Sequence, residues 1–299
     1  MKILTTLPDP TMRWLLVAMP FVFVLLWSTG FIVAKFGLPY APPLTFLVLR
    51  FTGVALVLLP LVLLMRAPWP HGRVLDIAMA GVLLHAGYVG GVWCAIKLGM
   101  PAGLAALIAG MQPVLTAFAA PLIGEKVRPR QWVGLLFGLS GVALVVSNKI
   151  NMVGLSYSSI GLAILGLLAI TVGTLYQKHR CAHFDLRSGT LIQYIASAAV
   201  MLPLAMVYEG FDGMLSTVMW TPRFIGALMW AIFVLSIGAV FLLFALIRQN
   251  AATSVTSLLY LTPPTTALIA WVMFGEIFSS VGIAGMVLAV LGVAFVVKK

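Results

Sequence analysis

Charged residues are scarce in this chain, and acidic ones scarcest of all. Only 8% of the 299 residues are charged, with seven Asp and Glu against 18 Lys and Arg, while 62% are hydrophobic. A soluble fold of this length could not hide so much apolar surface, so we expect the chain to fold in lipid. The two cysteines, Cys94 and Cys181, have no metal-ligand spacing, and the spans predicted below put them on opposite sides of the membrane. We therefore expect no disulfide, no metal and no cofactor.

Two further absences narrow the function. No phosphate-binding loop of the GxxxxGK[ST] type is present, so nothing indicates an ATP-driven pump. The net charge of +11 is not a nucleic-acid signal, because the basic residues lie in loops between apolar runs. We expect contact with anionic lipid headgroups and no binding of nucleic acid.

Long uncharged runs predict ten transmembrane helices, since about 20 apolar residues span the hydrocarbon core. The first run follows basic residues, but it is long for a signal peptide and no small-x-small cleavage site closes it, so we expect it to be retained. The ten helices are expected at 14–35, 43–65, 74–96, 102–123, 131–148, 157–178, 188–208, 223–246, 252–274 and 280–297.

The distribution of Lys and Arg orients these spans. Thirteen lie on the side of the termini and four in the opposite loops, with one more, Arg50, inside the second span. By the positive-inside bias this places both the N- and the C-terminus in the cytoplasm. We expect a multi-pass protein of the inner (plasma) membrane.

The sequence also contains an internal repeat, in which the second half of the chain resembles the first. Residues 107–146 align with 258–297 at an offset of 151 with 11 identities, among them Pro113 with Pro264 and Gly124-Glu125 with Gly275-Glu276. Chance similarity between apolar helices is the alternative, but it does not account for Gly-Glu and Pro landmarks in register. Five spans per copy is an odd number, so the second copy enters the membrane upside down. We predict an all-α integral membrane fold of ten helices, with inverted five-helix repeats at 14–148 and 157–297 around a central cavity.

Four motifs carry a resemblance to a known family. They are Trp27-Ser28-Thr29-Gly30-Phe31, Leu49-Arg50-Phe51, the run from Pro113 to Gly124-Glu125-Lys126, and its copy from Pro263-Pro264 to Gly275-Glu276. Together they resemble the drug/metabolite transporter superfamily in its ten-helix EamA-type branch, over nearly the whole chain. The resemblance implies export of amino acids or other small metabolites through a central cavity. Members similar to the YddG type export aromatic amino acids, although substrates differ widely within the branch.

Polar and aromatic residues at mid-membrane depth are the candidates for substrate binding, because they are costly there unless they serve packing or a path. For His85 three roles stay open: a substrate ligand, a proton carrier, or a hydrogen-bonded partner of another helix. Trp27 forms a cavity wall or fills the core. The candidates are Trp27, Ser28, Thr29, His85, Tyr88, Gln112, Thr171, Tyr176, Tyr260 and Thr262.

Three prolines are predicted to act as hinges. A proline inside a helix removes one backbone donor and frees a carbonyl one turn earlier, and such backbone is tolerated in a membrane only against protein or a watered cavity. Pro113 and Pro264 are equivalent in the two copies, and Pro263 precedes the latter. They mark kinks near the centre; simple packing kinks are the alternative.

Several residues near span ends have competing interpretations. Arg50 either extends its side chain toward the outer aqueous boundary or attracts a carboxylate substrate. Glu125 and Glu276 are expected to cap the fifth and tenth helices. Trp93, Trp132 and Trp220 are expected to anchor the membrane interface. The glycines of the fifth and tenth spans are expected to pack helices closely, within a copy or between two molecules.

These observations favour a carrier. No acidic residue lies at mid-membrane, so we expect facilitated or weakly proton-coupled export of a neutral or zwitterionic metabolite by alternating access. One alternative is a carrier of phosphorylated or nucleotide-linked metabolites, which would need several buried cations. Another alternative is a membrane enzyme. His85 has no acidic neighbour within its span for catalysis, so we expect no enzymatic activity. The sequence also leaves open whether the protein forms a homo-oligomer.

Overall fold

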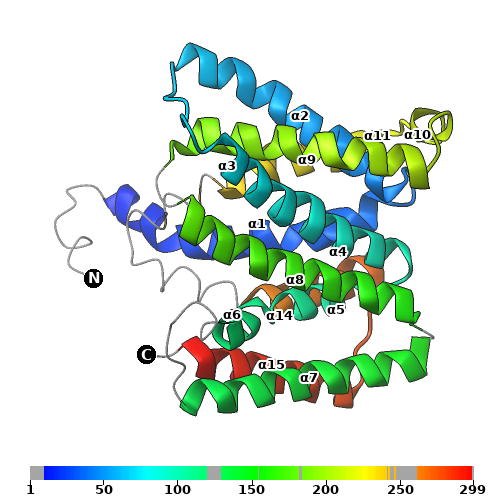
Figure 1. Ribbon diagram of the computed structural model, residues 1–299. Coiled ribbons are helices and arrows are strands. Elements are labelled where there is room, and N and C mark those ends of the chain that lie inside the picture. The colour runs from blue at the N-terminus through cyan, green and yellow to red at the C-terminus, as the bar shows by residue number, and fades with distance from the viewer. Residues whose placement is uncertain are drawn as a thin grey trace.

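The computed structural model describes residues 10–119, 129–153, 155–181, 184–240, 242, 246 and 261–297. Throughout these ranges every regular element is a helix and no strand occurs. Figure 1 shows long helices lying side by side and running between two ends of the molecule. At one of them, here called the α1–α2 end, α1 finishes and α2 starts; at the other, the α2–α3 end, α2 finishes and α3 starts.

Residues 10–153 and 155–297 each supply a set of helices. The first set is α1 (Pro10–Gly37), α2 (Pro43–Leu64), α3 (Val74–Gly81), the π-helix η2 (Val82–Gly87), α4 (Tyr88–Lys97), α5 (Ala102–Ala109), α6 (Gln112–Ala119) and α7 (Pro129–Val153). The second set is α8 (Tyr157–Arg180), α9 (Leu186–Tyr208), α10 (Gly213–Ser216), α11 (Pro222–Met229), the π-helix η4 (Trp230–Ala239), α14 (Thr262–Phe274) and α15 (Ser280–Val297).

In the described residues the predicted spans agree with this helix order, with one difference. Among the described residues, six helices are long and apolar enough to cross a membrane, at Ala18–Gly37, Pro43–Leu64, Val74–Lys97, Tyr157–Arg180, Leu186–Tyr208 and Pro222–Ala239. The fourth predicted span is not one helix but two, because the helix breaks at residues 110–111, just before Pro113. Residues 252–260 of the ninth span lie outside the described residues.

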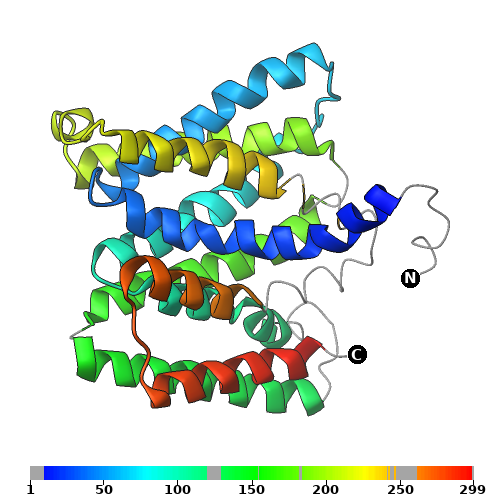
Figure 2. The ribbon, with the colours of Figure 1, turned by 180° about the vertical axis from the view of Figure 1, so that it is seen from behind.

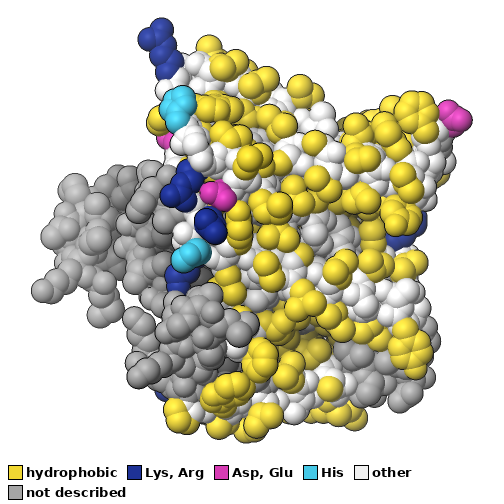
Figure 3. Space-filling view, viewed as in Figure 1, with side chains coloured by type: hydrophobic (Ala, Val, Ile, Leu, Met, Phe, Trp, Pro, Cys, Tyr) yellow, Lys and Arg dark blue, Asp and Glu magenta, His cyan; other side chains and the backbone are white. Residues whose placement is uncertain are grey.

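The surface is that of a protein embedded in lipid. Leu64, Leu75 and Ile277 are among many large apolar side chains that are mostly exposed. Figure 3 shows hydrophobic side chains spread over the middle of this face, with Lys, Arg and His gathered at one end of it. Apolar atoms around the middle and charges at an end match the hydrocarbon core and the headgroup zone of a bilayer.

Helices α2 and α9 lie antiparallel and are joined at both ends. At the α1–α2 end the carboxylate of Glu209 accepts hydrogen bonds of 2.7 Å from the backbone N–H groups of Leu44 and Thr45, the first turn of α2. At the opposite end Ser188 Oγ donates to the carbonyl of Pro68 at 2.7 Å. A carboxylate on the free N–H groups of a helix start satisfies donors that have no partner inside the helix.

Helices α7 and α15 lie side by side along one side of the molecule (Figure 2), and glycines bring their backbones into contact. A Cβ on Gly141 would lie 2.5 Å from the carbonyl oxygen of Gly285, and one on Gly292 would lie 2.3 Å from the backbone nitrogen of Gly138. Only residues without a side chain allow this approach. The glycines therefore pack α7, the fifth predicted span, against α15, the tenth, within one molecule.

Candidate functional site

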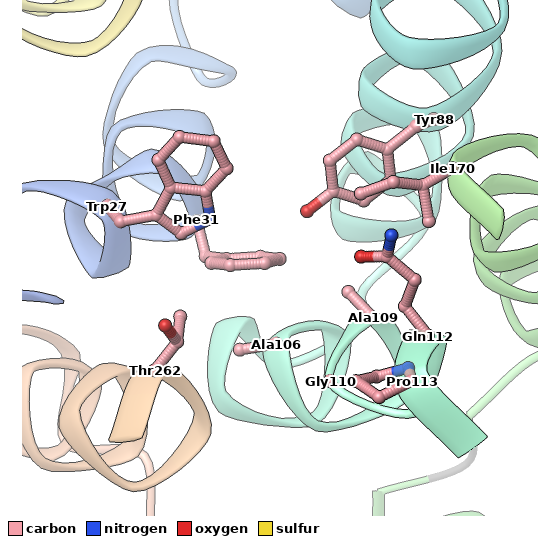
Figure 4. Close-up of a pocket in the computed structure, with 10 residues that line it drawn as sticks. All are labelled: Trp27, Phe31, Tyr88, Ala106, Ala109, Gly110, Gln112, Pro113, Ile170 and Thr262. Carbon is pink, nitrogen blue, oxygen red and sulfur yellow. The ribbon is translucent and has the colours of Figure 1, made fainter. Parts of the chain in front are cut away.

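A cavity lies where the broken helix α5–α6 crosses α14. It is lined by residues of α1, α4, α8 and α14 and by the α5–α6 break (Figure 4). The described lining residues are Trp27, Phe31, Tyr88, Ala106, Ala109, Gly110, Gln112, Pro113, Ile170 and Thr262. None of these ten carries a formal charge, so the cavity as described is apolar with a few dipolar groups.

Pro113 is the local cause of the break in the helix. It has no N–H to donate to the carbonyl of Ala109 one turn earlier. The chain tightens instead, and Met111 N donates to the carbonyl of Ile108 at 3.0 Å. The break falls at the cavity wall, which is where irregular backbone at membrane depth is tolerated.

The break of the first set of helices touches the start of α14 in the second. A Cβ on Gly110 would lie 2.8 Å from Cγ of Pro263, so the glycine is required for this approach. Pro263 is buried in the first turn of α14, and Pro264 beside it is exposed. Gly110 and Pro263 thus form a direct contact between the two predicted hinge regions.

One wall of the cavity is aromatic and the other polar. Trp27 and Phe31 lie one turn apart on α1 and approach from the same side in Figure 4, while the Tyr88 hydroxyl and the Gln112 amide point inward from the opposite side. Gln112 Nε2 donates to Thr174 Oγ1 at 2.8 Å, which orients the amide. Thr262 is 5% exposed, and its Oγ1 is buried without a hydrogen-bond partner among the described residues. An unpaired buried hydroxyl is costly, and a bound ligand would satisfy it.

The structure therefore brings five of the predicted residues together at this cavity: Trp27, Tyr88, Gln112, Pro113 and Thr262. It also adds apolar and small residues that the selection of polar side chains had passed over. Of these, only Phe31 carries a sequence signal, since it follows Trp27 by four residues and lies on the same helical face.

Other predicted residues lie away from the cavity lining, in contacts of their own. Ser28 Oγ donates to the carbonyl of Val24 at 2.7 Å, and Thr171 Oγ1 to that of Leu167 at 2.7 Å. Thr29 Oγ1 donates to the carbonyl of Leu26 and accepts from Trp230 Nε1 at 2.9 Å. Serine and threonine commonly bond back to the preceding turn of a helix, so depth in the membrane does not show which way they face.

Aromatic candidates outside the lining have partners elsewhere. Tyr176 OH donates to Asp76 Oδ1 at 2.7 Å, near the start of α3 at the α2–α3 end. The His85 ring stacks on Tyr194 with a centroid distance of 4.4 Å. Tyr260 and Glu125 lie outside the described residues.

A second group of contacts joins helix ends at the α1–α2 end, here called the Glu276 contact. Glu276 forms an ion pair with Lys35 at the end of α1, and it accepts a 3.0 Å hydrogen bond from the backbone N–H of Ala102 at the start of α5. Gly103 N donates to its other oxygen at 3.4 Å. Glu276 thus caps α5, the fourth span, and not the tenth helix as expected from sequence. The reason is that Gly275, with φ of 65°, turns the chain back toward α5 after α14 ends.

The described residues contain no group of three His, Cys, Asp or Glu side chains that could hold a metal ion. Cys94 and Cys181 are both free thiols.

The chain is similar to known proteins along most of its length. The model of the EamA-like transporter family matches residues 12–147 and again 157–298. The "Uncharacterized inner membrane transporter YedA" of Escherichia coli K12 is 27% identical over 262 residues, which cover 87% of this chain and 83% of that protein. A "Probable amino-acid metabolite efflux pump" of Salmonella typhimurium LT2 is 28% identical over 278 residues, or 90% of each chain.

The fold is also found in a solved crystal structure. It matches with a TM-score of 0.63 and 19% identity, over 93% of this chain and 94% of its own. At that identity the likeness shows the fold alone.

The two family matches, each covering one of the two sets of helices, agree with the repeat seen in the sequence. The chain is a membrane transporter of the EamA-like family, in the drug/metabolite transporter superfamily, as its helices, its lipid-facing surface and these matches show.

Proposed function

We propose that this protein exports amino acids with apolar or aromatic side chains, or closely similar small metabolites, from the cytoplasm by alternating access. The observation that carries the proposal is the cavity, which sets the aromatic wall of Trp27 and Phe31 against the polar groups of Tyr88 and Gln112, with Thr262 on the side of Trp27 (Figure 4). Such a lining suits a ligand with one apolar and one polar end. The name of the Salmonella relative, "Probable amino-acid metabolite efflux pump", points to the same class.

The charge distribution orients the carrier in our proposal. With both termini in the cytoplasm, the α1–α2 end faces away from it. The Glu276 contact then holds the outward side of α1, α5 and α14 together, and release of substrate to the outside requires that it open. The Gly110–Pro263 contact links the two hinge regions, so a bend in one half is transmitted to the other.

We further propose that export is facilitated or only weakly coupled to protons. None of the described lining residues is a carboxylate or a histidine, so the cavity itself offers no proton carrier in the described part of the chain. The same lining has no Lys or Arg, which favours a neutral or zwitterionic substrate over a phosphorylated one.

Transport by the purified protein tests this directly. Proteoliposomes preloaded with unlabelled tryptophan, phenylalanine, methionine or threonine are given the labelled amino acid outside, with and without an imposed pH gradient. We expect saturable exchange of tryptophan and phenylalanine without the gradient. Exchange of none of the four would remove the amino-acid assignment, and exchange that requires the gradient would remove the facilitated mechanism.

A matched pair of threonines tests the site. Thr262→Val removes the unpaired hydroxyl at the cavity, and Thr171→Val removes a buried hydroxyl of the same kind that bonds to its own helix. The loss of one neutral hydrogen bond, about 0.5–1.5 kcal/mol, should weaken apparent substrate affinity by about twofold to tenfold in T262V. T171V should leave it unchanged. Equal effects of the two substitutions would place the site elsewhere.

A further inference from the structure

Arg50 lies deep in the bundle. It is the eighth residue of α2, about 10 Å along the helix from its start, at about 1.5 Å per residue. The whole residue is 8% exposed. Of the two interpretations offered by the sequence, extension of the side chain to the aqueous boundary is therefore wrong.

The contacts of Arg50 come from neutral groups. Its Nε donates to Ser236 Oγ at 3.1 Å, and its guanidinium carbon lies 5.5 Å from the centroid of the Trp93 ring. Trp93 is itself 2% exposed, so it packs on the guanidinium and is not the interface anchor that its position in the sequence suggested. Ser236 donates in turn to the carbonyl of Ala231 at 2.9 Å.

No carboxylate forms an ion pair with Arg50 in the described residues. Glu209 is held by the first turn of α2, Glu276 by Lys35 and α5, and Asp185 by Arg187. The ionisable side chains that interact with Arg50 are His85, Tyr88 and Tyr194. An arginine stays charged in proteins, and a buried charge without a counter-charge is strongly disfavoured. The guanidinium thus has the planar, double donor face that suits a carboxylate, but no carboxylate of its own.

Tyr88 connects this group to the cavity. It lines the cavity on one side and is among the neighbours of Arg50 on the other. His85 lies one turn before it, and His85 Nε2 is buried with no hydrogen-bond partner among the described residues. The helices are locally irregular here, since His85 lies in the π-helix η2 and Ser236 in the π-helix η4, a distortion that is frequent at functional sites.

We propose that Arg50 is the carboxylate-recognising residue of the transport path. A substrate that moves past Tyr88 presents its carboxylate to the guanidinium, and the unpaired Nε2 of His85 takes part in the same polar group. The inference rests on the proposed function and adds a requirement to it: the substrate carries a carboxylate next to its apolar side chain. It also explains how a cavity whose described lining is uncharged accepts an amino acid.

The unmodified protein provides the first test. The best exchanged of the four amino acids is compared with its carboxamide, which keeps size and shape but lacks the negative charge, as competitors of labelled exchange. We expect the amide to compete at least about tenfold more weakly, since a hydrogen-bonded charge pair is lost. Equal competition would overturn the role of Arg50. Absence of exchange by any amino acid would instead overturn the proposed function, so the two failures are distinguishable.

Substitution provides the second test. Arg50→Gln removes the charge, Arg50→Lys keeps it without the planar fork, and Arg223→Gln removes an exposed arginine at the end of the bundle as a matched control. We expect the preference for acid over amide to fall to near unity in R50Q, to persist in part in R50K and to stay unchanged in R223Q. A preference that survives in R50Q would refute the proposal. If R50Q does not fold, the preference for acid over amide in R50K and in the unmodified protein still decides whether Arg50 recognises the carboxylate.

Discussion

The Glu276 contact predicts a measurable change in access from the α1–α2 end. Glu276→Gln keeps the size of the side chain and one carbonyl acceptor but removes the charge that attracts Lys35 and the N-terminus of α5. The side chain of Glu276 is 6% exposed and that of Lys35 is 33% exposed, so the pair is half in water and is weaker than a fully buried one. We take about 1 kcal/mol for this partly exposed ion pair and about 0.5 kcal/mol for the helix dipole.

Together these contributions set the size of the effect. A loss of about 1.5 kcal/mol from the closed arrangement alone raises the ratio of open to closed molecules roughly tenfold. The assay is the rate at which a membrane-impermeant maleimide added from outside labels Ala106→Cys, a cavity position that is 1% exposed, after Cys94 and Cys181 have been replaced by serine. We expect labelling about tenfold faster in E276Q.

Glu209→Gln is the control for this experiment. Glu209 also caps a helix start, that of α2, but it joins α2 to α9 and has no lysine partner among the described residues. We expect E209Q to lower the thermal unfolding temperature without a comparable gain in labelling. If E276Q lowers that temperature but labels at the wild-type rate, the contact is structural and the reasoning about access is wrong.

Two further predictions concern stability. Gly292→Ala would place a Cβ 2.3 Å from the backbone of Gly138 and should cost about 1–3 kcal/mol, seen as earlier thermal unfolding in detergent, whereas Gly161→Ala, with open space around it, should cost nothing comparable. Asp185 caps α9 through Arg187 N at 2.9 Å, and the Arg187 side chain holds the pKa of this carboxylate below its ordinary value. Asp185→Ala should therefore lose about 1 kcal/mol near neutral pH. The loss should shrink as the pH falls from about 4, the ordinary pKa at which the unfolded chain protonates, toward the lower pKa of the folded carboxylate. The exposed Asp212→Ala should show neither effect, and an equal loss at all pH values would refute the charge-based account.

The sequence predicts most clearly what depends on the backbone. The helix break before Pro113 follows from a missing backbone donor in the same segment. The glycines of α7 and α15 predict close helix packing, but not that these two helices pack against each other. The depth of Trp27, Tyr88, Gln112 and Thr262 follows from their place within apolar runs, and all four line the cavity.

Contacts between distant helices could not be predicted in the same way. Thr171 and Thr262 look alike in the sequence, but one hydroxyl bonds to its own helix and the other lies at the cavity without a partner among the described residues. Glu276 precedes α15 yet caps α5, because the turn at Gly275 sets its direction. Trp93 was expected at the membrane interface, and extension of Arg50 to the aqueous boundary was one of two interpretations, yet both residues are buried and the guanidinium lies over the Trp93 ring.

The Gly110–Pro263 contact has a consequence for the symmetry of the binding site. Two identical copies related by a two-fold axis would present the same side chains from both sides. At the offset of 151, Gln112 corresponds to Pro263 and Met111 to Thr262, so the duplicated halves have diverged where they meet. Gln112 and Thr262 therefore offer an amide from one copy and a hydroxyl from the other, without a mirror or rotational equivalent. A ligand with two unlike ends could bind a two-fold symmetric site in two equivalent orientations, so divergence at the crossing point gives a symmetric scaffold the means to favour one of these orientations.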